Sequence, residues 1–270
     1  MEVSARPDGR PALTAAAMTG PVKRDRIINV SLVFVCQICH HLTFFGIALF
    51  LPLIREDLQI TYTQAGVLSA AVTLSYALGQ IPAGYLADRF GARRLFFIGL
   101  MGWTFLSLSL ALIHSYWLAV LNLFVAGMFR ALLFAPGLRL LASWFPPERG
   151  ATAMSLYMVG GYVGNILLSL VGPALAATLG WRTTFIGIGV ITLGFTALVW
   201  LIVRDAGPQA RDAGHHASLR EDFAGLLQVI RTPSIGRLFL LQLTSYPSYL
   251  LVIGLWGGPY LTHVYGFDLT

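Results

Sequence analysis

The chain has 270 residues, of which 56% are hydrophobic and 11% are charged, and its formal net charge is +6. Soluble globular domains carry roughly 25% charged residues, so this composition leaves too few to build a water-exposed surface. The basic residues flank long apolar runs and do not form one basic face, which excludes a nucleic-acid-binding domain. The composition therefore predicts an all-α integral membrane protein whose partner is the lipid bilayer.

Seven apolar runs are long enough to cross a bilayer, which takes about 20 residues in a helix. We divide the chain into a cytoplasmic N-terminal tail (1–27), a six-helix transmembrane bundle (28–204), a cytoplasmic linker (205–237) and a seventh transmembrane helix (238–270). Because the last helix would lack neighbours, we expect a fragment whose C-terminal half is missing. The runs are Ile28–Leu53, Thr63–Leu86, Leu95–Ile113, Trp117–Leu141, Thr152–Leu179, Thr184–Val203 and Leu238–Leu261.

The tail and the linker are the polar parts of the sequence. The tail has no apolar segment followed by a small-residue cleavage site, so it is not a signal peptide. In the linker, Leu219–Ile230 has apolar residues at helical spacing, which predicts an amphipathic helix at the membrane surface. His215 and His216 precede it, but a metal site needs more ligands than these two. We predict no metal and no cofactor.

Both cysteines, Cys36 and Cys39, lie inside the first apolar run. A C-x-x-C pair can be redox-active in a soluble βαβ unit. No strand pattern surrounds this pair, so we favour a packing role in a membrane helix.

The arginines and lysines set the orientation, because they accumulate on the cytoplasmic side. With the N-terminus inside, fourteen of the 18 basic residues fall in cytoplasmic segments, while Arg55 and Arg182 fall outside and Arg130 and Arg139 lie within the fourth run. The sequence therefore predicts a cytoplasmic N-terminus. The fourteen are Arg6, Arg10, Lys23, Arg24, Arg26, Arg89, Arg93, Arg94, Arg149, Arg204, Arg211, Arg220, Arg231 and Arg237.

A glycine-rich and charged segment follows the second run. Gly84 would let a neighbouring helix approach closely, Asp88 places an acid at a helix end, and Gly91 permits a tight turn. An ordinary cytoplasmic loop would account only for the arginines. The segment reads Gly84-Tyr85-Leu86-Ala87-Asp88-Arg89-Phe90-Gly91-Ala92-Arg93-Arg94.

This segment resembles the signature loop of the major facilitator superfamily, G-x-L-A-D-R-x-G-x-R-R, between helices two and three. Trp144–Gly150, Gly180–Arg182 and Gly254–Leu261 resemble other segments of the family, and the likeness covers Arg26–Thr270. It implies two six-helix halves, each an inverted repeat of three helices. It also implies a conformational gating loop that clamps the halves together, formed here by Gly84, Asp88, Arg89, Gly91, Arg93 and Arg94.

The sequence departs from the family pattern in two places. Phe134 follows Arg130 where the family's fourth-helix motif has glycine. Ala176 and Ala177 stand at later glycine positions of the antiporter motif around Gly172-Pro173. The second departure argues against an antiporter.

Ionisable residues in the bilayer cost about 3 kcal/mol and therefore indicate function. No Asp or Glu lies within the seven runs, and Arg130 lies near the middle of the fourth. Its partner would be an anionic substrate group or an acid of the missing half, and a structural hydrogen-bonding role is the alternative. His40 and His41 are candidates for a coupling proton, with an ordinary hydrogen-bonded role as the alternative.

Polar stripes add further candidates. Helices one, four and seven line the central cavity in the family, which adds Gln37, Gln242 and Tyr246 to the substrate and coupling candidates. The stripe of Ser69, Thr73, Tyr76 and Gln80 in the second run predicts a polar helix interface. In the fifth run, Gly160, Gly161 and Gly164 predict a close-packing face.

The predicted function is secondary active transport of a small solute by alternating access, in a bacterial inner membrane. Arg130 without intramembrane acids favours an anionic organic or inorganic solute, carried by symport with a proton or ion. No phosphate-binding loop and no motif of an intramembrane enzyme is present, so we predict neither ATP-driven transport nor an enzyme. A multidrug efflux antiporter and a non-transporting sensor or half-transporter remain as alternatives.

Overall fold

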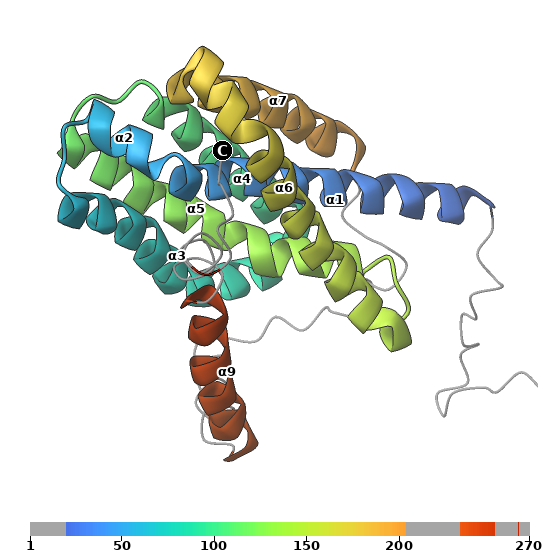
Figure 1. The fold of residues 1–270 in the computed structure, drawn as a ribbon. Helices are drawn as coiled ribbons and strands as arrows, with labels where there is room; N and C mark the ends of the chain where they lie inside the picture. Colours follow the sequence, from blue (N-terminus) through green and yellow to red (C-terminus); the bar gives the residue numbers. More distant parts are fainter. Residues whose placement is uncertain (1–19, 204–232, 252–263, 265–270) are drawn as a thin grey trace, which may run out of the picture. The chain divides into compact units, whose positions relative to one another are not determined.

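The computed structural model describes residues 20–203, 233–251 and 264, and within them the regular structure is helical (Figure 1). These residues belong to two compact units, one that contains α1 to α7 and one that contains α9. The helices are α1 (Gly20–Leu49), α2 (Leu51–Asp57), α3 (Tyr62–Phe90), α4 (Ala92–Leu110), α5 (Tyr116–Ala142), η2 (Pro147–Arg149), α6 (Gly150–Leu179), α7 (Trp181–Ile202) and α9 (Pro233–Leu251).

The first helix differs from its predicted limits at both ends. It begins at Gly20, so part of the expected tail is helical, because Lys and Arg continue a helix well beyond the apolar run. It ends at Leu49, and the short helix α2 follows with Pro52 in its first turn, where the missing N–H is tolerated. The first apolar run is therefore two helices, where we predicted one.

The signature segment is mostly helical, although we expected a loop. The helix α3 begins at a capping box, in which the Thr61 hydroxyl accepts a hydrogen bond from the Gln64 N–H at 3.2 Å. It continues to Phe90, so Gly91 alone separates α3 from α4. Gly180 in the same way separates α6 from α7. Both glycines have positive φ, 88° and 79°, which glycine adopts without a steric penalty.

The helices of the first unit pack as two triplets. One triplet consists of α3, α4 and α5, and the other of α1, α6 and α7. The largest interface between the triplets is that of α4 with α7. The core contains Trp103, Tyr157 and Phe185, whereas other large apolar side chains such as Leu170 and Leu201 lie exposed. Exposed apolar side chains on long helices are expected where the surrounding solvent is lipid.

Four of the described helices are long and apolar enough to cross a membrane, namely α1, α5, α6 and α7. The helix α3, which carries the polar stripe of the second run, and the helix α4 do not combine the same length and hydropathy. The helix α9 begins at Pro233, five residues before the predicted seventh run. Residues 233–237, which we assigned to the cytoplasmic linker, are therefore part of a helix. The end of the seventh run, the rest of the linker, its amphipathic helix and His215–His216 lie outside the described residues.

The predicted close-packing face of the fifth run is confirmed. A Cβ added to Gly164 would lie 2.6 Å from the carbonyl oxygen of Ile38 in α1, and one added to Gly161 would lie 2.6 Å from the His41 ring. The helices α1 and α6 therefore touch nearly backbone to backbone. At Gly84, by contrast, an added Cβ would meet no heavy atom of the described residues within 4 Å, so the close approach we expected there does not involve any described helix.

Candidate functional site

A small cavity of about 30 Å³ lies between the two triplets of the first unit. The helices α1 and α6 line it from one triplet, and α3 and α5 line it from the other. A volume of this size holds one or two water molecules. The lining residues are Gln37, His40, His41, Tyr76, Arg130, Leu133, Phe134 and Tyr157.

Arg130 supplies the permanent charge of the cavity. It is the fifteenth of the 27 residues of α5, so it lies roughly 20 Å from either end of that helix. Its guanidinium carbon lies 3.6 Å from the ring centre of Phe44 and 4.0 Å from that of Tyr76. Such cation–π contacts hold the group in place and are worth about 2 kcal/mol when desolvated. Since arginine stays protonated and none of the lining residues is an acid, the cavity is positively charged.

Gln37 and His40 bring buried polar atoms to the cavity. Their side chains are 5% and 4% exposed. The Gln37 Oε1 atom and both ring nitrogens of His40 have no hydrogen-bond partner among the described residues. A buried polar atom without a partner costs about 1–3 kcal/mol, so these atoms are suited to hydrogen-bond a molecule that enters the cavity.

His41 of α1 is held by α6, another helix of the same triplet. Its Nδ1 atom lies 3.2 Å from Oδ1 of Asn165 in α6. Because the asparagine oxygen accepts hydrogen bonds only, the ring donates from Nδ1, and Nε2 is then the acceptor of the neutral imidazole. The asparagine thereby fixes both the orientation and the tautomer of His41.

Two sets of buried hydrogen bonds hold the helices that line the cavity. The Trp103 indole N–H donates to the Thr43 hydroxyl at 2.7 Å, and that hydroxyl donates to the carbonyl oxygen of His40 at 2.9 Å. On the opposite side, the Tyr157 hydroxyl donates to the carbonyl oxygen of Leu133 at 2.7 Å. These bonds connect α1 to α4 and α6 to α5, so they also connect the two triplets.

The structure brings four of the sequence-predicted candidates together, namely Gln37, His40, His41 and Arg130. Gln242 is exposed on α9 in the second unit, and the side chain of Tyr246 lies outside the described residues. Tyr76 lies in the α3–α5 contact as expected for a helix interface, but it also lines the cavity.

Among the residues of the gating loop, Arg93 donates a hydrogen bond to the carbonyl oxygen of Trp200 at 2.5 Å, and Arg89 donates to the Tyr85 hydroxyl at 3.3 Å. Arg94 is exposed, and the Asp88 side chain lies outside the described residues. The described contacts of this segment are therefore made within the first unit.

Sequence reasoning missed Phe44, Asn165 and Tyr157 as residues of the site. Phe44 follows His40 by four residues, and Asn165 follows Gly161 by four, so helical spacing places each on the face of a residue that was already singled out. Tyr157 gave no signal of its own, because a tyrosine near a helix end is common at membrane surfaces.

A comparison with protein families matches residues 33–270 to the model of the Major Facilitator Superfamily. The chain belongs to this family. It is accordingly an integral membrane protein, and the predicted all-α fold is confirmed.

Several proteins that resemble the chain are named as bacterial transporters. An uncharacterized transporter of Bacillus subtilis, YybO, is 28% identical over 230 residues, which cover 81% of this chain and 53% of the relative. The D-galactonate transporter of Escherichia coli O6:H1 is 28% identical over 183 residues, covering 67% of this chain and 42% of the relative. The chain thus spans about half the length of the curated relatives it matches.

A solved structure shares the fold. It is a bacterial homologue of the human lysosomal transporter Spinster in an inward-facing, unoccupied conformation, and the two agree with a TM-score of 0.66 at 19% identity. The alignment covers 93% of this chain and 58% of that structure. At this identity the likeness establishes the fold alone.

Proposed function

We propose that this chain forms the N-terminal half of a secondary active transporter that moves a small organic anion by alternating access across a bacterial inner membrane. The observation that carries the proposal is a cavity that contains the fixed charge of Arg130, the buried polar atoms of Gln37 and His40, and no acidic residue. Relatives named as D-galactonate, hexuronate and galactarate/D-glucarate transporters support a sugar acid as the substrate class.

The chemistry of the cavity matches the two ends of such a molecule. A carboxylate would lie at the planar edge of the Arg130 guanidinium, which can donate two parallel hydrogen bonds to it. Hydroxyl groups would donate to Gln37 Oε1 or bond to the ring nitrogens of His40. A volume of about 30 Å³ is too small for a whole sugar acid, so this cavity is one subsite. We propose Gln242 and Tyr246 as further substrate-binding residues.

Proton coupling would fall to histidine in this chain. His40 and His41 line the cavity, where the carboxylates that carry protons in many transporters do not occur. Protonation of either ring would add positive charge beside Arg130, so a bound proton and a bound anion would each favour the other. If the proton and the anion bind together and cross the membrane together, transport is symport. Asp88 and the arginines that follow it would control the conformational equilibrium from the cytoplasmic face.

Uptake kinetics test the role of Arg130 in a full-length transporter that contains this sequence, with D-galactonate as the probe. Arg130→Lys keeps the charge but loses the planar fork, so we expect the KM to rise at least tenfold, which corresponds to about 1.4 kcal/mol of binding. Arg130→Ala should abolish uptake without loss of the protein from the membrane. Arg139→Ala, in the last turn of the same helix, is the matched control and should leave the KM unchanged.

An unchanged KM in both Arg130 variants, measured per molecule in the membrane, would refute the substrate role. Efflux of a cationic dye by the parent, without uptake of any organic anion, would favour the multidrug alternative instead. Loss of folded protein in the Arg130→Ala variant with a normal KM in the surviving molecules would indicate a structural role only.

A further inference from the structure

A three-residue pattern occurs twice in the first unit. Gly91-Ala92-Arg93 connects α3 to α4, and Gly180-Trp181-Arg182 connects α6 to α7, with corresponding residues 89 positions apart. In both, the glycine is the single residue between two helices and has positive φ. In both, the arginine is the second residue of the helix that follows. The two junctions are therefore corresponding elements of the inverted repeat, and α4 and α7 are corresponding helices.

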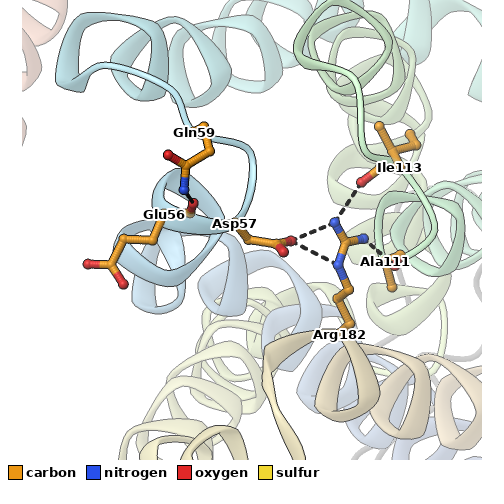
Figure 2. Close-up of polar contacts among 6 residues, drawn as sticks. All are labelled: Glu56, Asp57, Gln59, Ala111, Ile113 and Arg182. Atoms are coloured by element: carbon orange, nitrogen blue, oxygen red, sulfur yellow. Dashed lines mark hydrogen bonds and ion pairs between the residues drawn. The ribbon is translucent and has the colours of Figure 1, made fainter.

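Each arginine donates to the C-terminal end of the other helix. Arg182, at the start of α7, donates to the carbonyl oxygens of Ala111 at 2.5 Å and Ile113 at 2.9 Å, just beyond α4 (Figure 2). Arg93, at the start of α4, donates to the carbonyl oxygen of Trp200 at 2.5 Å in the last turn of α7. These carbonyl groups belong to helix ends, where partners within the helix run out. The two contacts lie about 27 Å apart along α4.

The helix dipole explains why each arginine is more favourable at the end of the other helix than in its own helix. A cation in the first turn of its own helix lies at the unfavourable, positive end, whereas a cation at the C-terminal carbonyl groups of another helix is stabilising. Neither arginine therefore stabilises the helix that carries it. Each also has a second support: Asp57 of α2 forms an ion pair with Arg182 at 2.5 Å, and the Arg93 guanidinium lies 5.2 Å from the ring centre of Trp200.

We infer that Arg93 and Arg182 are positioning residues, reciprocal staples that close the two ends of the α4–α7 interface and thereby fix the spacing of the two triplets. This interface is the largest one between the triplets. The cavity also lies between the two triplets, with Gln37 and His40 of α1 on one side and Arg130 of α5 on the other. The staples consequently hold the two sides of the cavity at a set distance. The inference rests on the proposed function only where it concerns substrate binding.

Cysteine accessibility in the full-length transporter, in membrane vesicles, tests the staples directly. Reporter cysteines are placed at Ile113, which is 8% exposed beside the Arg182 contact, and at Val203, which is 1% exposed near the Arg93 contact. Arg182→Ala should raise the maleimide labelling rate at position 113 at least tenfold and that at position 203 less than twofold. Arg93→Ala should do the reverse. The buried native cysteines set the background rate, which is measured in the parent.

Matched controls separate a staple from a general loss of positive charge. Arg55→Ala beside Asp57 and Arg149→Ala at an exposed position before α6 should leave both labelling rates near those of the parent. Where an alanine variant does not reach the membrane, Asp57→Asn and Arg93→Lys replace it and should raise the rate at the near end by a smaller factor. Unchanged rates at the near ends, or equal increases in the control variants, would overturn the staples.

Uptake of D-galactonate tests the positioning of the cavity separately. Both alanine variants should raise the KM at least fivefold. Maximal uptake per molecule should change less than twofold in Arg182→Ala, which lies outside the gating loop. Raised labelling with an unchanged KM would overturn the positioning role. Absence of D-galactonate uptake in the parent would count against the proposed function, whereas the labelling result would still decide whether the staples exist.

Discussion

Gly180→Ala is predicted to destabilise the first unit although nothing obstructs the new methyl group. An added Cβ at Gly180 would meet no heavy atom of the described part of the chain within 4 Å, so the effect comes from the backbone. The residue has φ 79° and ψ 155°, a combination that is essentially restricted to glycine. Alanine held in that conformation costs of order 1–3 kcal/mol.

The neighbouring hydrogen bonds limit how far the backbone can relax. The Gly180 N–H donates to the carbonyl oxygen of Ala176 at 3.0 Å, and the Gly180 carbonyl oxygen accepts from the Thr184 N–H at 3.2 Å. Rotation of φ to a negative value would break at least one of these bonds, which costs about 0.5–1.5 kcal/mol. The protein would take whichever of these two changes costs less, so we expect a loss of roughly 0.5–1.5 kcal/mol in the free energy of unfolding.

Gly187→Ala is the matched control in the same helix. Its added Cβ also meets no described heavy atom within 4 Å, but Gly187 lies inside α7 with ordinary helical geometry. Alanine is the better helix former by roughly 0.8–1 kcal/mol, so this variant should be stabilised. Unfolding by denaturing detergent, followed by circular dichroism, measures both variants against the parent. A Gly180→Ala variant as stable as Gly187→Ala would refute the assigned backbone conformation.

The remaining predictions concern the support of the cavity, the gating loop and the orientation. Thr43→Val should cost about 1–3 kcal/mol in the same unfolding assay, because it leaves the buried Trp103 N–H without an acceptor, whereas the exposed Thr73→Val should be nearly neutral. In a full-length transporter, Asp88→Asn should reduce uptake with normal amounts of protein in the membrane, and uptake equal to the parent would remove the gating role. Ala92→Cys should react with an impermeant maleimide only in inside-out vesicles; reaction on intact cells would reverse the orientation.

The helices were predictable because the bilayer imposes a simple rule of length and hydropathy. Five helices, α3 to α7, were located within a few residues of the predicted runs, and the glycine face of α6 was identified from spacing alone. The break at Phe50 was missed, because α2 is also apolar at its start and hydropathy carries no information about a change of direction. The helical continuation from Gly84 to Phe90 was missed for the opposite reason, since charged residues at a helix end read as a loop.

The site was predictable only where the cost of burial made a residue conspicuous. Arg130 and the two histidines stood out because polar groups are expensive in lipid. Phe44 and Tyr157 did not, because an aromatic residue in an apolar run has no distinguishing feature until its partner is known. The partners of Arg93 and Arg182 were also out of reach, because backbone carbonyl groups occur at every residue and only the fold selects which ones an arginine meets.

The glycine face of α6 also restricts how the lining of the cavity could change over time. A side chain at Gly161 would require the His41 ring to shift, since an added Cβ would lie 2.6 Å from it. A smaller residue at position 41 would therefore ease a later substitution of Gly161. At Gly164 the obstruction is the backbone oxygen of Ile38, so no side-chain change relieves it. Gln37 and Arg130, which do not face the glycines so closely, are the positions from which a new specificity would begin.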